Sequence, residues 1–90
     1  MILYLDTSAL VKLYAEEAGS EVVRRTVAAS DLIATSLLSY AEARSALARK
    51  CRGGEIAHAA LNRLRQEFER DWARLHVLPL MKRWCVRPAI

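Results

Sequence analysis

The sequence predicts an α/β fold in which helices cover a parallel sheet. Three short apolar segments, residues 1–5, 32–35 and 76–80, are separated by two longer segments in which apolar residues recur at helical spacing. Each longer segment has room for two helices and carries glycine near its middle. The order strand, two helices, strand, two helices, strand favours a layered fold whose parallel strands are joined by helical crossovers.

The first strand and the two helices after it are predicted from the first 30 residues. Residues 1–5 form a continuous apolar run, which is typical of a strand that a parallel sheet buries on both faces. A first helix follows, and Gly19 is a plausible stop for it, with Ser20 capping the next helix. The second helix is expected to end at about residue 30. We expect Val22, Val23 and Val27 to point inward, with Arg24 and Arg25 outward.

The second half of the chain repeats this order. After the strand at residues 32–35, an Ala-rich helix is expected to begin at Ser36 or Ser39 and to end before Gly53 and Gly54. A long amphipathic helix is predicted over residues 55–74, followed by the third strand at 76–80. The expected apolar face of the long helix consists of Ala57, Leu61, Leu64, Phe68 and Trp72.

Length and composition predict one small cytosolic domain. A chain of 90 residues buries only about three-fifths of its unfolded surface, so its stability is expected to be modest. The apolar start is too short and lacks the basic lead of a signal peptide, and no segment is long enough to span a membrane. Cys51 and Cys85 lack zinc-ligand spacing and are interpreted as free thiols.

The net charge of +4 is a weak argument for a nucleic-acid partner, because of where the charges lie. Lys82, Arg83 and Arg87 supply three of the 14 basic residues, which leaves 11 basic and 10 acidic residues before position 81. Nine of those 11 are arginine, the side chain best shaped for bidentate phosphate contacts. The charge balance alone therefore does not predict RNA binding.

Asp6 is the first candidate functional residue. It stands where the first strand ends and a helix begins, and ligands of open α/β sheets bind at the carboxyl ends of strands. Thr7 and Ser8 follow it with hydroxyl groups that can bond a bound water. The alternative is structural, because Asp in such a turn can cap the helix through backbone N–H groups. Asp31 is no partner, since it precedes its strand.

Glu42 is the second candidate. No basic residue lies three or four positions away on its helix, so it has no local ion pair. One interpretation is a capping box formed with Ser39, which matches the pattern S-x-x-E. The other is that Glu42 points over the sheet end toward Asp6 and shares a divalent cation with it. If the helix begins at Ser36, Ser39 lies inside it and the capping box disappears.

Two motifs give the chain a resemblance to a known family. The runs D-T-S-A-L-V-K-L-Y at residues 6–14 and Y-A-E-A-R at residues 40–44, with F-E-R-D-W at residues 68–72, are similar to the first half of PIN-domain proteins of the VapC-like toxin type. The resemblance covers residues 1–80 in order. It implies a PIN-like three-layer fold with a parallel sheet, here incomplete, with about three strands and four helices.

The resemblance also implies a function and a site. VapC-like proteins are Mg²⁺- or Mn²⁺-dependent endoribonucleases, usually the toxin of a toxin-antitoxin pair, often dimeric and silenced by an antitoxin. Carried over to this sequence, the metal ligands and catalytic residues are Asp6 and Glu42, and Ser8, with Thr7 beside it, would hold water next to the metal. Carboxylates and waters are the ligands that such cations prefer.

The chain departs from the family after Leu80. Relatives continue with another helix and further acidic residues, whereas residues 81–90 match no such pattern. Met and Trp each have one codon, so part of the reading frame that starts one base earlier can be reconstructed from residues 80–85. That frame reads Asp-Glu-Ala-Val-Val if the codons of Leu80, Lys82 and Arg83 end in G. We therefore predict an N-terminal part of a PIN domain at 1–80 and an out-of-frame tail at 81–90, which sequencing the locus tests.

Three functions are consistent with this sequence. The first is a nuclease whose activity is reduced or absent because later acids are missing. The second is a non-catalytic fragment that binds an antitoxin or another protomer, since the first strand, central in the family, would become an exposed edge. The third is an RNA-binding module that uses Arg63, Arg70 and Arg74, although acidic residues interleave with them.

Overall fold

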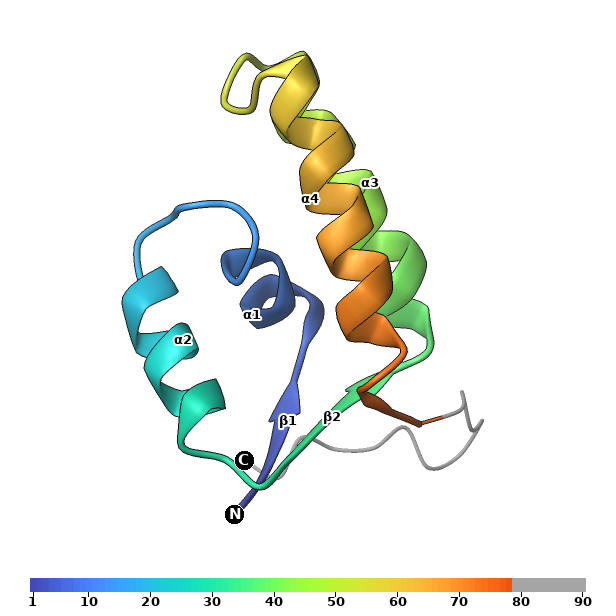
Figure 1. Cartoon of the computed structure of the whole chain (residues 1–90). Coiled ribbons are helices and arrows are strands. Elements are labelled where there is room, and N and C mark those ends of the chain that lie inside the picture. The colour runs from blue at the N-terminus through green and yellow to red at the C-terminus, as the bar shows by residue number, and fades with distance from the viewer. Residues whose placement is uncertain (79–90) are drawn as a thin grey trace.

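The computed structural model describes residues 1–78 and contains a parallel sheet with four helices (Figure 1). The strands are β1 (Ile2–Leu5), β2 (Leu32–Ser36) and β3 (His76–Leu78), in the order β1-β2-β3. The helices are α1 (Thr7–Lys12), α2 (Ser20–Ala28), α3 (Leu38–Arg52) and α4 (His58–Trp72). The predicted α/β class and parallel sheet are confirmed. The predicted tail at 81–90 lies outside the described residues.

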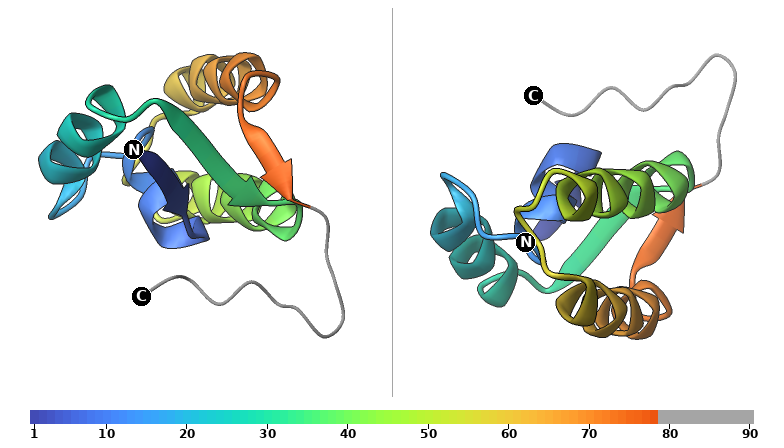
Figure 2. Two further views of the ribbon diagram at one scale, coloured as in Figure 1. Left: turned by 90° about the horizontal axis from the view of Figure 1, so that it is seen from below. Right: turned by 90° about the horizontal axis from the view of Figure 1, so that it is seen from above.

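The helices form two outer layers around the sheet. Figure 2 shows α1 next to α3, and α4 across the strands from α3, while α2 lies beyond the edge strand β1 and packs against α1. The core lies where α1, α3 and α4 meet, and Leu10, Leu47 and Phe68 are fully buried there. The ring of Phe68 packs edge-on against Tyr14, with 5.5 Å between the ring centroids. This core holds α1 and α3 side by side, which positions the candidate site.

The first strand is less buried than its composition predicts. Within residues 1–78, β1 is an edge strand, and only Leu5 of its four residues is buried, while Ile2 is 70% exposed. The expectation of burial on both faces is therefore wrong for this structure. The expectation of an exposed edge at β1 agrees with it.

Two details of α2 differ from the sequence interpretation. Gly19, not Ser20, occupies the cap position, where its φ of 93° suits glycine. Ser20 is the first helical residue, and its buried hydroxyl accepts from the Glu17 amide and donates to the Ala15 carbonyl. Val22 is 63% exposed, because only one stripe of this short outer helix faces the core.

The long amphipathic helix is shorter at its start than predicted. The amide groups of Glu55 and Ile56 both donate to the carbonyl of Lys50, at 2.9 and 3.3 Å, and so close the end of α3. Those residues belong to the turn, and α4 begins at His58. No helix among residues 1–78 is long and apolar enough to cross a membrane.

Candidate active site

The register of the sheet brings the two acid-bearing segments together. Leu5 of β1 lies opposite Thr35 of β2, and the fully buried Thr35 hydroxyl donates to the Leu5 carbonyl at 2.9 Å. The chain leaves both strands at this edge, toward Asp6 on one side and Ser36 on the other. Since parallel strands end at the same edge, α1 and α3 both begin beside it.

Asp6 caps α1. Its Oδ1 accepts a 2.9 Å hydrogen bond from the amide of Ala9, and its backbone is extended, as a capping residue requires. The structural alternative for Asp6 is therefore confirmed. The carboxylate is exposed, and its other oxygen has no hydrogen bond within residues 1–78. The cap thus occupies one oxygen and leaves the other free to bind a ligand.

Glu42 is not part of a capping box. The helix α3 begins at Leu38, whose amide donates to the Ser36 hydroxyl at 3.1 Å. Ser39 is already inside the helix and only 3% exposed, so its side chain is not placed to cap the first turn. Because Leu37 occupies the cap position of α3, Ser39 is not the capping residue, and Glu42 needs another partner.

That partner is Thr7. The Thr7 hydroxyl donates to Oε1 of Glu42 at 2.6 Å and also lies 3.0 Å from Oγ of Ser39. A hydroxyl has one proton, and a carboxylate can only accept, so Ser39 is left to donate in the second contact. The position expected for Thr7, beside a metal-bound water, stays a prediction. The observed contact fixes the carboxylate of Glu42 to the start of α1.

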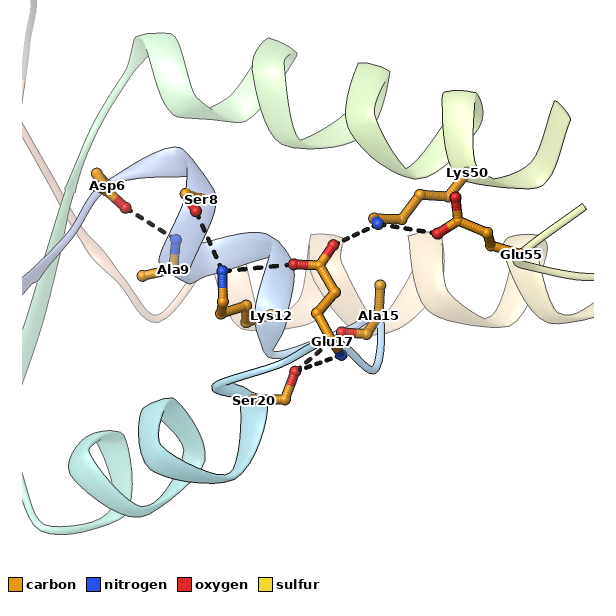
Figure 3. Close-up of polar contacts among 9 residues, drawn as sticks. All are labelled: Asp6, Ser8, Ala9, Lys12, Ala15, Glu17, Ser20, Lys50 and Glu55. Carbon is orange, nitrogen blue, oxygen red and sulfur yellow. Dashed lines mark hydrogen bonds and ion pairs between the residues drawn. The ribbon is translucent and has the colours of Figure 1, made fainter. Parts of the chain in front are cut away.

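Ser8 contacts the first residue of a network of charged side chains (Figure 3). Its hydroxyl accepts from Nζ of Lys12 at 3.3 Å, and Lys12 lies 3.5 Å from Glu17. Glu17 also pairs with Lys50 of α3, which reaches Oε1 of Glu55 at 3.2 Å. Lys50 and then Lys12 lower the pKa of Glu17, while Glu17 and Glu55 raise the pKa of Lys50. The network ties α1 to the end of α3 and to Glu55 in the turn that follows it.

Sequence reasoning missed this network. Ser8 and Lys12 are four residues apart on one helix, so their contact could have been predicted from spacing. Glu17 and Lys50 are 33 positions apart, and no local pattern connects them.

A groove of about 730 Å³ runs between α1 and α3. One end is lined by Thr7, Ser8 and Glu42, and the other by Arg49 and Lys50. The groove therefore combines a carboxylate end with hydroxyl groups and a basic end on one helix, α3.

The remaining candidates lie away from this groove. His58 and His76 are exposed. Cys51 is a buried free thiol whose Sγ lies 3.4 Å from Nδ1 of His58, and Cys85 lies outside the described residues. Arg74, considered for RNA binding, pairs with Asp71 at 3.3 Å.

Comparison with known proteins identifies the family. The family profile of the PIN domain matches residues 3–86. The chain belongs to the PIN domain family. It is similar to two Mycobacterium tuberculosis proteins, Ribonuclease VapC45 of strain CDC 1551 / Oshkosh and Ribonuclease VapC49 of strain H37Rv. Each is 33% identical over 72 residues, which are 80% of this chain and 50% of the relative, so the chain spans about half the length of these curated relatives.

The oxygen donors of this PIN domain suit a hard cation. Asp6 offers its free carboxylate oxygen, and Glu42 offers the oxygen that Thr7 does not bond. Mg²⁺ is commonly held by one or two carboxylates, with waters completing its shell. Residues 1–78 contain no cluster of three or more His, Cys, Asp or Glu side chains placed to hold a metal. Among the described residues, Asp6 and Glu42 are therefore the carboxylates available for a cation at this strand edge.

Proposed function

We propose that this PIN domain carries the metal-binding site of a Mg²⁺- or Mn²⁺-dependent endoribonuclease, the toxin component of a type II toxin-antitoxin system in the cytoplasm. The observation that carries the proposal is the hydrogen bond between Thr7 and Glu42, which brings the carboxylate of α3 to the strand end where Asp6 lies. The names of the two ribonuclease relatives support RNA cleavage as the activity.

Each residue of such a site would have its own role. Asp6 and Glu42 would hold the cation, which when bound supplies an activated water and offsets charge at the scissile phosphate. Thr7 keeps Glu42 in place from the neighbouring helix. The Ser8 hydroxyl accepts from Lys12, so its own proton remains free to donate to a water in the groove.

Metal binding and RNA cleavage test this proposal separately. Titration calorimetry with Mn²⁺ should show binding to the 90-residue chain that Asp6→Asn and Glu42→Gln both abolish. Asp31→Asn is the matched control, because Asp31 is exposed and precedes β2 at the other edge of the sheet. Cleavage of an end-labelled structured RNA should require Mg²⁺ or Mn²⁺ and be lost in the same two variants. Equal metal binding by all variants would contradict the assignment.

A non-catalytic interaction fragment is the second candidate function. It is favoured by the edge strand β1, whose first residue, Ile2, is 70% exposed and follows Met1, which is 61% exposed. A fragment of this kind would bind an antitoxin or a second protomer through that edge and the neighbouring helices. Co-purification with the antitoxin encoded beside it, or a dimer by light scattering, together with no cleavage in any metal, would favour this function over the nuclease.

A further inference from the structure

The basic end of the groove contains a charge that the proposed metal site does not use. Four charged residues line the groove, namely Glu17, Glu42, Arg49 and Lys50. Glu17 and Lys50 pair with each other, and Lys50 is further bonded to Glu55. This pairing leaves Glu42 at one end and Arg49 at the other.

Arg49 is free to bind a ligand from solution. Its side chain is exposed, and it forms no ion pair or side-chain hydrogen bond with another residue of the 1–78 segment. It follows Glu42 by seven residues on the continuous helix α3, which places it two turns, or about 10 Å, further along the same wall. Between them the wall carries only the small side chains of Ser45 and Ala46.

We propose that Arg49 binds a backbone phosphate of single-stranded RNA next to the phosphate that lies at Asp6 and Glu42. The choice of RNA rests on the proposed function. An unpaired guanidinium binds phosphate through two parallel hydrogen bonds, and the small residues let a sugar-phosphate chain lie close to the helix. Arg49 thereby offsets the repulsion between the RNA and the carboxylate end, and sets the direction in which the strand crosses the groove.

RNA binding without cleavage tests this inference. Fluorescence anisotropy of a labelled 12-nucleotide oligouridylate, in EDTA, should be compared between the full 90-residue chain and Arg49→Gln. For single-stranded RNA, each phosphate contact makes the binding constant fall with the salt concentration raised to a power of about 0.7. If Arg49→Gln removes one such contact, its affinity for the RNA should be lower than that of the wild type by about eight-fold at about 0.05 M salt and about four-fold at about 0.15 M salt. Arg49→Lys keeps the charge and should lose less.

Arg52→Gln is the matched control. Arg52 lies on the same helix, is exposed, carries the same charge and does not line the groove. Circular dichroism should show that each variant remains folded. If Arg49→Gln does not fold, Arg49→Lys is compared with the wild type instead.

The inference is overturned if the chain does not bind the RNA, if both Gln variants weaken binding equally, or if Arg49→Gln weakens binding of polyglutamate but not of RNA. If RNA binding depends on Arg49 but the chain shows no metal-dependent cleavage, this inference is supported and the proposed nuclease activity is refuted.

Discussion

The hydroxyl of Thr7, the first residue of α1, donates a 2.6 Å hydrogen bond to Oε1 of Glu42, 35 positions later on α3. Together with the contact between Thr7 and Ser39, this bond joins two segments that follow different strands at the carboxyl edge of the sheet. Because Glu42 is exposed, this contact restricts the orientation of a side chain that would otherwise sample several rotamers. The proposed metal site depends on that restriction.

Removing the Thr7 hydroxyl should weaken metal binding without unfolding the protein. Loss of a side chain that orients a metal ligand typically costs ten-fold or more in affinity, so Thr7→Val should raise the Kd for Mn²⁺ by about ten-fold. Thr7→Ser keeps the hydroxyl and should bind nearly normally. The control is Thr26→Val on α2, because the Thr26 hydroxyl bonds the Val22 carbonyl and no other group of residues 1–78. An unchanged Kd for Thr7→Val would show that Glu42 is positioned without Thr7.

The contact between Tyr14 and Asp71 should make stability depend on alkaline pH. The Tyr14 hydroxyl donates to Asp71 at 2.8 Å, and burial, followed by this bond, raises the pKa of Tyr14 above 10. The folded state therefore favours the protonated form, and its stabilisation is complete below pH 10 and lost as the pH rises through the folded pKa. Above pH 10 the free energy of unfolding should therefore fall as the pH rises.

Urea unfolding of Tyr14→Phe checks this relationship. The variant should lose about 1–2 kcal/mol near neutral pH and should lack this part of the alkaline decline. Tyr4→Phe is the control, because Tyr4 has no side-chain hydrogen bond within the described segment. Parallel alkaline curves for the wild type and Tyr14→Phe would refute the assignment.

Leu47 should be a major determinant of stability. It is fully buried on α3 within the core cluster, and truncating such a side chain costs about 2–5 kcal/mol. Leu47→Ala should therefore shift the urea midpoint strongly or unfold a domain of this size at room temperature. Leu37→Ala, at a side chain that is 51% exposed, should change the free energy of unfolding by less than about 0.5 kcal/mol. Equal losses in the two variants would contradict the described core.

The Glu17 network should make stability depend on acidic pH. Its hydrogen bond and charge contact with Lys50, then those with Lys12, lower the pKa of Glu17 below 4.5. A lowered folded pKa gives stabilisation that is complete above pH 4.5 and lost as the pH falls through the folded value. Thermal melts between pH 6 and 3 should therefore show a steeper fall in Tm for the wild type than for Glu17→Gln. Glu67→Gln, which removes an acid outside this network, should follow the wild-type slope.

The sequence determined the elements of this fold. The apolar runs and helical spacing predicted all three strands and four helices near their observed positions. A helix that buries one face has apolar residues at helical spacing, and a buried strand has a short apolar run, so both can be recognised locally in the sequence. The same local information placed Asp6 at a strand-to-helix turn, and this position is observed. It offered Ser36 or Ser39 as the start of the next helix, whereas Ser36 ends β2 and α3 begins at Leu38 with Leu37 as its cap. Element ends were less predictable, since the turn at Glu55 is closed by bonds back to Lys50.

Only the tertiary structure decided which side chains meet. Thr7 and Glu42, and likewise Glu17 and Lys50, are more than 30 positions apart and carry no pattern that links them. Their contacts follow from the register of β1 against β2 and from the packing of α1 on α3, which bring distant segments to one edge. The edge position of β1 in the described segment was also decided by strand order, because an apolar run has the same composition wherever it lies in a sheet.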